Sequence, residues 1–459
     1  MSLFCSLIFV VRQILTFIHS FPFFSTNSRS MMPPYPGACP ADNDLYAKYK
    51  AIRGNVALTM EGPDGINGTA DDLHQLPVTG HNCSAFGLHQ NLGFLKELYD
   101  KGEAIFTANT GLLARPVDKS NYRTETPVQL FAHNAMQKES KQLDLEKEIR
   151  GTGIIGRIAD SLNANGFSCG TYSIDGNQIA LVGEPGVSPS PIILSKDGMK
   201  EFDPESSSSN LARLVDEKFG MPEVIRSLNS ATTADSNFFA ETWSLKVTEA
   251  MDQYAEIYTA LENTYVPSGF PNTGLAEQLR LVTQLMQSRA ERGKDRDIFY
   301  VEVGGWDTHS YVLDELVENF GNVNAALEAF VNEVTALGLW QSTTLMQFSE
   351  FARTLDPNSG PSGDGTGAGS DHGWGGHNFI IGGSLKGGQV LGEYPDEFSE
   401  DGERALSRGR MVPKTPWDAT FNGVAEWMGV PGQELNVTIP HRKNFLGENL
   451  LFDKDTLFK

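Results

Sequence analysis

Short apolar runs alternate with longer segments of helical periodicity along this chain of 459 residues. Residues 104–111 are predicted as a short apolar strand that runs into a loop, 297–307 as a buried strand, and 343–350 as a strand that ends at Glu350. Strands that alternate with helices in this way predict an α/β fold. The expected helices lie at about 44–53, 92–102, 127–149, 151–166, 209–219, 235–262, 275–292 and 311–337.

The first 24 residues are rich in apolar side chains, but Arg12, Gln13 and His19 interrupt them. A bilayer span needs roughly 20 apolar residues, so no stable membrane span is expected here. A signal peptide, a mis-assigned start and a buried strand stay open as alternatives, and a location in the secretory pathway stays open with them. We divide the chain into a leader at 1–29 and one domain at 30–459, with a helical block at about 209–292.

The composition is acidic, with 58 Asp and Glu against 36 Lys and Arg and a net charge of −22. A surface of this sign repels polyanions, so nucleic acid is not expected as a partner. An anionic substrate would therefore need a local positive site, which a metal ion can supply. Cysteine is sparse, and Cys39 and Cys83 could form a disulfide in a secreted protein or be two free thiols.

Three motifs bring acidic and imidazole side chains together in one stretch of the chain. They are GGWDTHS at 304–310, SEFARTL at 349–355 and SDHGWGGHNF at 370–379. Ligand sites of open α/β sheets lie at the carboxyl ends of the strands, so polar residues that follow apolar strands are expected to converge. Carboxylates and neutral imidazoles suit zinc first, with manganese, iron or calcium as alternatives. The candidate metal ligands are Asp307, His309, Asp371, His372 and His377.

Each motif also has a structural interpretation. Asp-x-His can be a helix cap followed by a surface histidine, and Asp-His-Gly alone is a weak signal. Both motifs together with a third histidine favour a metal or anion site. Arg353 lies three residues after Glu350 and can pair with that carboxylate on a helical turn or clamp an anion, and the spacing favours the structural role.

The chain resembles domain-of-unknown-function family 1501, which is similar to the alkaline phosphatase and sulfatase superfamily. The matching stretches cover most of residues 30–430 and are LYAKYKAIRGNVAL (45–58), FGLHQNLGFLKELYDKGEA (86–104), NTGLLARPV (109–117), LFAHNAMQ (130–137), GGWDTHS, SEFARTL and DHGWGGHNFIIGG (371–383). The resemblance implies a three-layer α/β/α sandwich and a pair of metal ions beside a Ser, Thr or modified Cys nucleophile. It also implies that the five candidate ligands hold those ions, although Asp307 and His309 are spaced more tightly than the superfamily's usual Asp-x-x-x-His.

Two departures from the family pattern bear on catalysis. Family members resemble LFSHN where this chain has LFAHN at 130–134, so Ala132 stands where a hydroxyl nucleophile is expected. The family also begins with a strand and a turn that carries an aspartate ligand. Asn27 is the residue nearest that position, and an amide is a poorer ligand than a carboxylate. A wrong gene start would account for a missing first strand.

The leading hypothesis is a metal-dependent hydrolase of phosphate or sulfate esters, with a small-molecule or glycan anionic ester as substrate. With alanine at position 132, water would attack directly, and His133 or Glu350 would be the general base. The alternative is a non-catalytic descendant of the fold that binds a metal or another ligand. A purely structural acidic protein would require the histidine cluster to be coincidental. The sequence predicts neither the substrate nor the oligomeric state.

Overall fold

A large, mainly parallel sheet forms the centre of the protein. This computed structural model describes residues 13–20, 31–62, 65–66, 69, 72–149, 151–196, 221–230, 237–359 and 367–459. Nine strands form the sheet in the order β10-β4-β9-β8-β1-β7-β5-β6, with β13 also beside β4. The strands are β1 (Gln13–Ser20), β4 (Ala104–Gly111), β5 (Cys169–Ser173), β6 (Ile192–Ile193), β7 (Arg296–Val303), β8 (Thr343–Ser349), β9 (Gly376–Gly382), β10 (Gln389–Gly392) and β13 (Thr415–Pro416). Among the described strands of this sheet, only β9 runs antiparallel to its neighbours, β4 and β8.

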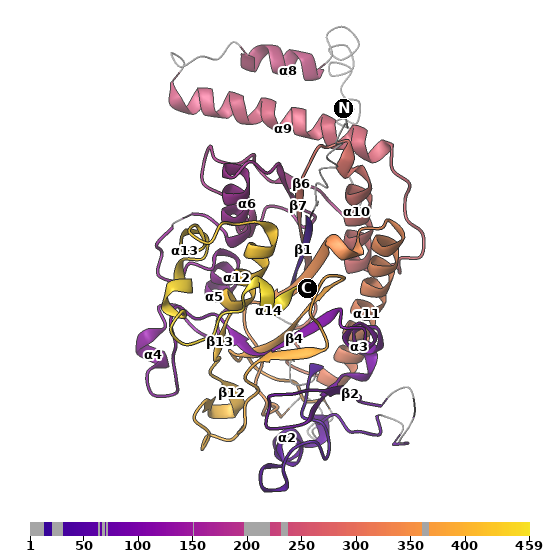
Figure 1. The fold of residues 1–459 in the computed structure, drawn as a ribbon, viewed down its shortest axis with the longest axis vertical. Coiled ribbons are helices and arrows are strands. Elements are labelled where there is room, and N and C mark those ends of the chain that lie inside the picture. Colours follow the sequence, from indigo (N-terminus) through magenta and orange to yellow (C-terminus); the bar gives the residue numbers. More distant parts are fainter. Residues whose placement is uncertain are drawn as a thin grey trace, which may run out of the picture.

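Twelve α-helices accompany the sheet in the described part of the chain. They are α2 (Leu45–Arg53), α3 (Gly93–Asp100), α4 (Tyr122–Glu125), α5 (His133–Gln142), α6 (Ile154–Ala164), α8 (Met221–Ser230), α9 (Phe238–Glu262), α10 (Gly274–Gln287), α11 (Val312–Ala336), α12 (Trp417–Met428), α13 (Leu435–Thr438) and α14 (Lys454–Leu457). Figure 1 shows α3, α10 and α11 on one side of the sheet and α6 and α12 on the other. Two small antiparallel sheets pair β2 (His74–Pro77) with β3 (Ala85–Leu88) and β11 (Ala405–Leu406) with β12 (Arg410–Met411).

Alternate side chains of the central strands enter two separate hydrophobic cores. In β7, Phe299 belongs to the core that includes Leu279 of α10, whereas Ile298 belongs to the core that includes Ile158 of α6. Successive side chains of a strand point to opposite faces, so a strand covered on both faces carries apolar residues on both of them. This explains why the middle of β7, residues 298–301, is an uninterrupted apolar run. The α/β fold expected from the sequence is confirmed, with helices on both faces of the sheet.

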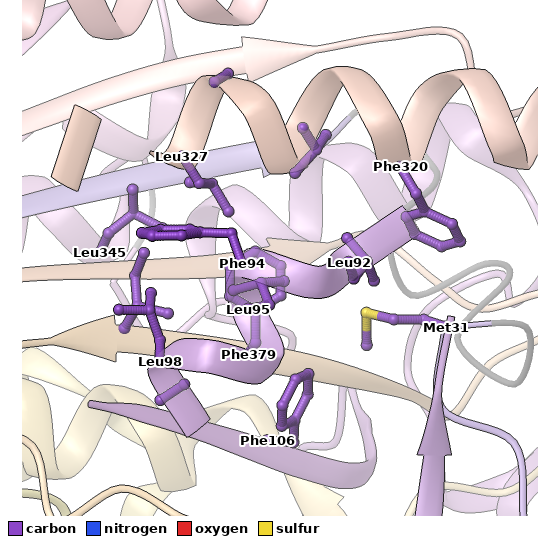
Figure 2. Packing of buried hydrophobic residues seen from close by; sticks show 14 of the residues in the cluster. Met31, Leu92, Phe94, Leu95, Leu98, Phe106, Phe320, Leu327, Leu345 and Phe379 are labelled. Carbon is purple, nitrogen blue, oxygen red and sulfur yellow. The ribbon is translucent and has the colours of Figure 1, made fainter. Parts of the chain in front are cut away.

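One face of the sheet is covered through α3, which lies between α11 and the strands. Figure 2 shows Phe94 and Leu95 of this helix directed towards Leu327 of α11 and towards the side chains of the sheet. Burial of such large apolar side chains contributes about 1.5–3 kcal/mol each. The same packing holds α11 in place, and the segment after β7 enters this helix.

The segment expected as a leader contains the central strand of the sheet. Gln13–Ser20 forms β1, which pairs in parallel with β7 on one side and β8 on the other. Ile14 and Leu15 are both buried and belong to the two different cores. Residues 13–20 therefore form a buried strand, one of the three alternatives left open for this segment. The first strand that the family pattern requires is present. Asn27 lies outside the described residues.

Several predicted elements differ from the observed ones at their boundaries. The helix expected at 127–149 is limited to α5, because Phe131 and Leu143 have positive φ angles of 64° and 49°, which an α-helix excludes. The strand expected at 297–307 ends at Val303, and two glycines follow it. The helix expected at 209–219 lies outside the described residues. In the loop expected at 356–370, residues 360–366 are outside them as well.

Two further findings concern the outer parts of the protein. Cys39 and Cys83 form a disulfide, while Cys169 is a buried free thiol. Of the two alternatives for this cysteine pair, the structure contains the bonded one. Among the described residues, no helix combines the length and the apolar character that crossing a bilayer requires.

Candidate metal centre

Four of the five candidate ligands meet at one edge of the central sheet. Asp307 and His309 lie in the turn after β7, and Glu350 directly follows β8. Asp371 and His372 were expected to follow a strand, but they precede β9. Because β9 is antiparallel to β8, its beginning lies at the same edge as the end of β8, and convergence is preserved.

Backbone pairing fixes these loops against one another. The N–H of Ser370 donates to the carbonyl of Thr308 at 2.9 Å, and the N–H of Thr354 donates to the carbonyl of Asp371 at 2.8 Å. The loop after β7 and the segment before β9 are thereby joined, and the segment after β8 is joined to them. The acidic and imidazole side chains they carry are held at defined positions rather than on independent loops.

A fourth element, α5, brings in His133 from a distant part of the sequence. His133 is the first residue of this helix, and Ala132 is the N-cap residue without a side-chain cap hydrogen bond. The positive φ of Phe131 turns the chain sharply just before the helix begins. His133 is thus directed into the site, and the position before it lacks a hydroxyl group, as the sequence indicated.

Three imidazole rings surround the carboxylate of Asp307. Nε2 of His309 lies 2.9 Å from Oδ1 of Asp307, and Nε2 of His372 lies 3.4 Å from the same oxygen. Nε2 of His133 lies 3.6 Å from Oδ2. Ligand atoms of His133, Asp307 and His372 lie within 4.8 Å of one another, a spacing that could hold a metal ion.

The opposite ring nitrogens of the three histidines all contact fixed oxygen atoms. Nδ1 of His133 lies 2.8 Å from Oε1 of Glu350, and Nδ1 of His309 lies 3.1 Å from Oδ1 of Asp371. Nδ1 of His372 lies 2.9 Å from the carbonyl oxygen of Phe131. Metal-binding histidines commonly donate their second ring N–H to a carboxylate or a carbonyl, which fixes the tautomer and the ring orientation.

The tautomer of His372 is determined by its partner. A backbone carbonyl only accepts hydrogen bonds, so Nδ1 of His372 must carry the proton that it donates to Phe131. In the neutral ring, Nε2 then has a lone pair. This atom is buried without a hydrogen-bond partner among the described residues, and it faces a carboxylate oxygen of Asp307. Two acceptors that face each other are stabilised by a cation between them, so these residues fit a bound metal ion.

Arginine side chains surround this group of acceptors. The guanidinium of Arg353 is fully buried, and it donates to Asp307 and to the side chain and carbonyl of Ser370. Arg408 pairs with Asp371, and Arg410 donates to the carbonyl oxygen of His372 at 2.7 Å. All three donor groups of Arg353 are therefore used within the protein. Arg353 thus has a structural role in holding Asp307 in place, but the expected pairing with Glu350 is wrong, because the segment after β8 forms no helical turn and the guanidinium is directed to Asp307 and Ser370.

The electrostatics of the site favour charged aspartates and a neutral glutamic acid. Burial alone would raise the pKa of Asp307, but hydrogen bonding and charge from Arg353 outweigh it and lower the pKa. Burial would also raise the pKa of Asp371, but the hydrogen bond and the charge of Arg408 outweigh burial and lower that pKa. Burial raises the pKa of Glu350 to about 9 and lowers the pKa of His133, which the neighbouring His372 lowers further.

The structure does not bring His377 into the three-residue group. It lies on β9 and is fully buried, with its ring stacked on Tyr394 at a centroid distance of 4.8 Å. Nδ1 of His377 accepts a hydrogen bond from the backbone N–H of Asn109. These contacts place His377 between β4 and the Tyr394 segment.

Some residues of the site were missed by reasoning from the sequence. Arg408 and Arg410 flank a glycine, and two arginines so close together in a strongly acidic chain could have indicated an anion-binding position. Gln137 lies one helical turn after His133 and donates to Glu350 at 3.5 Å, which only the helix boundaries reveal. The carbonyl of Phe131 has no sequence signal, because any residue supplies a carbonyl.

One family model matches part of the chain. Residues 217–414 match the model of a family described as "Protein of unknown function (DUF1501)". This segment contains Asp307, Glu350 and His372 and excludes His133. A search of the curated proteins found no match.

One similar solved structure is described as "Crystal structure of Ps i-CgsB". It is 10% identical in sequence, and the match covers 76% of this chain and 71% of that chain, with a TM-score of 0.27. The similarity over the whole fold is therefore weak. The resemblance to the uncharacterised family is supported, and the relation to alkaline phosphatases and sulfatases stays a proposal.

Proposed function

We propose that the protein is a metal-dependent hydrolase of phosphate or sulfate esters, with an alkaline phosphatase-like or sulfatase-like site. The observation that carries the proposal is the buried lone pair of His372, which faces Asp307 while Nδ1 is held by the carbonyl of Phe131. A cation resolves this arrangement, and the donor set of imidazole and carboxylate favours zinc, with manganese, iron or calcium as alternatives.

We assign the ligands as His133, Asp307 and His372. When bound, the ion would polarise an ester oxygen and lower the pKa of water in the site. Glu350 was a candidate base, but its fully buried side chain contacts the ring of His133 and would instead orient that ligand. Asp371 similarly holds Nδ1 of His309, which makes it an orienting residue for that ring.

His309 is the residue best placed to accept a proton from water. Its side chain is 47% exposed, compared with 33% for His133 and 21% for His372. With Nδ1 held by Asp371, the lone pair of Nε2 lies against Asp307, and it would become available to a water as general base when a bound ion takes up that carboxylate. Asp307 lies close enough to stabilise the imidazolium that results.

The preference for an anionic ester follows from two neighbouring arginines at the site. Burial lowers the pKa of Arg410, and the positive charge of Arg408 lowers it further, so the two guanidinium groups repel each other. Each also bonds to a residue of the site, Arg408 to Asp371 and Arg410 to His372. A phosphate or sulfate group would relieve this repulsion, because guanidinium groups bind such oxyanions in a bidentate manner.

Ala132 supports a second candidate function, which is metal or ligand binding without turnover. It is the N-cap residue of α5, and it places a methyl group where a hydroxyl could have served as nucleophile. If the protein is a hydrolase, water must attack the ester directly. If it is a binding protein, it holds the same ion and uses the same arginines, but no attack takes place.

Elemental analysis combined with an ester panel tests both functions. We expect about one equivalent or more of a divalent metal in the purified protein. A His372→Ala variant should lose most of it, because the ring supplies a ligand atom. A His81→Ala variant is the matched control, since His81 contacts the carbonyl of Val390 away from the motifs. Wild-type protein that binds no metal, although it is folded, would refute the proposed site.

The panel then separates the two functions. Metal-dependent release of phosphate or sulfate from an aryl ester, lost in His372→Ala and retained in His81→Ala, would support the hydrolase. Metal binding without turnover of any aryl, alkyl or sugar ester would favour the binding protein.

A further inference from the structure

Phe131 lies just before α5 in a backbone conformation that bulky residues rarely adopt. Its φ angle is 64°, in the left-handed region, where glycine is favoured because it has no Cβ. A residue in such a conformation is held there by its surroundings, and residues of this kind gather at functional sites. The strain indicates that the side chain of Phe131 contributes something that a glycine could not supply.

Both backbone polar groups of Phe131 are bonded by side chains. Its N–H donates to Sδ of Met136 at 3.2 Å, and Met136 is fully buried in α5. Its carbonyl oxygen accepts the hydrogen bond from Nδ1 of His372 at 2.9 Å. These two contacts fix the left-handed conformation, and that conformation directs the carbonyl towards the metal ligand.

The ring of Phe131 contacts one of the two arginines of the site. The guanidinium carbon of Arg410 lies over this ring, 5.2 Å from its centroid. The negative face of an aromatic ring attracts a cation at this distance. Nε of Arg410 donates to the carbonyl of His372 at 2.7 Å, and Nη1 donates to that of Ser407 at 3.3 Å. Nη2 has no hydrogen-bond partner in the described part of the chain, so it can donate to a ligand.

Phe131, His372 and Arg410 therefore form a closed set of contacts. The carbonyl of Phe131 bonds to the imidazole of His372, the carbonyl of His372 bonds to Arg410, and Arg410 returns to the ring of Phe131. A long side chain that is already ordered loses less rotamer freedom when a ligand arrives, and its affinity for the ligand is higher for that reason.

Phe131 also packs against the hydrophobic core that includes Met136. Packing alone would be served by another large apolar side chain, whereas the orientation of a cation requires an aromatic face. Leucine and tyrosine at position 131 separate these two roles. Leucine retains apolar bulk without an aromatic face, and tyrosine retains the face.

We propose that Phe131 is a positioning residue for the oxyanion of the substrate, with its ring orienting Arg410 and its carbonyl orienting the metal ligand His372. One residue thereby fixes the group that binds the phosphate or sulfate relative to the group that binds the ion. This inference rests on the proposed function, because it takes the ester oxyanion as the ligand of Arg410.

A double-mutant cycle with inorganic phosphate as the probe tests this proposal. The proteins are the wild type, Phe131→Leu, Arg410→Gln and the double variant, with Phe131→Tyr as the variant that retains an aromatic face. Calorimetric titration measures phosphate affinity in Zn²⁺-loaded and in chelator-treated protein. Metal content and thermal unfolding are measured in parallel.

Phe131→Leu should weaken phosphate binding by about 2- to 10-fold, because Arg410 loses a contact that orders it. Phe131→Tyr should bind phosphate as the wild type does. In the Arg410→Gln background, Phe131→Leu should have no further effect, because the ring acts through Arg410. Unchanged affinity in Phe131→Leu, an equal loss in Phe131→Tyr, or the same loss without Arg410 would overturn the proposal. If Phe131→Leu does not fold, Phe131→Met completes the same cycle.

Phe131→Gly tests the backbone separately from the ring. Glycine adopts a φ of 64° without strain, so the carbonyl should stay on His372 and metal content should equal that of the wild type. Phosphate affinity should fall as in Phe131→Leu. Asn449→Gly is the matched control, since Asn449 is exposed with a similar φ of 52°, and it should change neither quantity. Loss of metal from folded Phe131→Gly would overturn the role of the left-handed backbone.

The same measurements separate this inference from the proposed function. Wild-type protein that holds no metal, yet binds phosphate with the expected coupling between Phe131 and Arg410, would uphold the role of the ring and refute the metal site. Wild-type protein that holds metal and binds phosphate, with affinity unchanged in Phe131→Leu, would leave the function standing and refute the inference. Folded wild-type protein that binds no phosphate, with or without metal, would also overturn it.

Discussion

Ala132, the N-cap residue of α5, occupies the position where the family pattern predicts a serine hydroxyl. The first N–H groups of a helix lack intrahelical partners, and a serine at the N-cap accepts a hydrogen bond from one of them. Ala132 has an extended backbone, with φ −126° and ψ 121°, that a serine can adopt. Ala132→Ser should therefore increase the free energy of unfolding by about 1 kcal/mol.

Urea unfolding measures this increase directly. An Ala132→Cys variant serves as the control, since cysteine has a similar size and a much weaker acceptor. An equal gain in both variants would contradict the capping explanation. If the serine also raised ester turnover without changing metal content, the missing hydroxyl would be identified as the factor that limits the chemistry.

Asp418 is a buried carboxylic acid whose titration should make stability depend on pH. It is fully buried in α12, and neither side-chain oxygen has a hydrogen-bond partner among the described residues. Burial raises its pKa from 3.8 to about 7. Well below the ordinary pKa of 3.8 the group is neutral in both states and its contribution to stability is complete. As pH rises to about 7, only the unfolded chain loses the proton, so the folded state is progressively disfavoured.

The size of this effect follows from the shift in pKa. The free energy of unfolding of the wild type, relative to Asp418→Asn, should fall by on the order of 4 kcal/mol between pH 4 and pH 8. Chemical denaturation at several pH values measures it, and exposed Asp401→Asn is the control. A constant difference between wild type and Asp418→Asn would show that Asp418 is ionised when buried.

At the scale of elements, β1 is the strand on which the sheet depends most. It joins the β7 side to the β8 side, and these two strands position Asp307 and Glu350. Leu15 is fully buried in the core that includes α6 and α12. Leu15→Ala should lower the free energy of unfolding by about 2–5 kcal/mol, the usual range for a large-to-small change in a core.

Denaturant unfolding tests this prediction against Leu446→Ala, at a residue that is 52% exposed. The control should change stability by no more than about 0.5 kcal/mol. A chain that starts at residue 22 should fail to fold, since it lacks the central strand. A soluble and cooperatively unfolding truncated chain would show that β1 is dispensable.

The elements also show what a sequence alone can predict. Strands such as 104–111 and 343–350 were predicted close to their observed bounds, because every position of β4 and β8 is buried and apolar residues occur on both faces. The limits of α5 depend on left-handed residues at Phe131 and Leu143, which no apolar pattern encodes. His372 was expected after a strand, but it precedes β9, which runs antiparallel to β8 and so brings it to the same edge from the other direction.

The site was predicted in part for the same reason. Asp307, His309 and Glu350 follow strands, and their convergence follows from the parallel order of those strands. The contacts that assign roles could not be predicted, because they join distant segments. The carbonyl of Phe131 determines the tautomer of His372, and Arg408 pairs with Asp371 across 37 residues.

At the scale of the whole molecule, the net charge of −22 and the arginine-rich site have opposite effects on ligands. The acidic surface concentrates cations around the protein and repels anions before they reach Arg408 and Arg410. Salt screens this long-range field, whose reach falls from about 30 Å at 0.01 M to about 10 Å at 0.1 M ionic strength. Short contacts within the buried site are screened much less.

Divalent metal affinity should therefore decrease as salt increases. Raising the ionic strength from about 0.01 M to about 0.15 M removes most of the attraction of the distant carboxylates. The dissociation constant for Mn²⁺ or Zn²⁺, measured by titration, should rise several-fold, while the number of bound ions stays constant. N-methylglucamine chloride is the appropriate salt, because its bulky cation cannot compete for the ligand atoms. An affinity that is independent of salt would mean that His133, Asp307 and His372 determine metal binding without help from the surface charge.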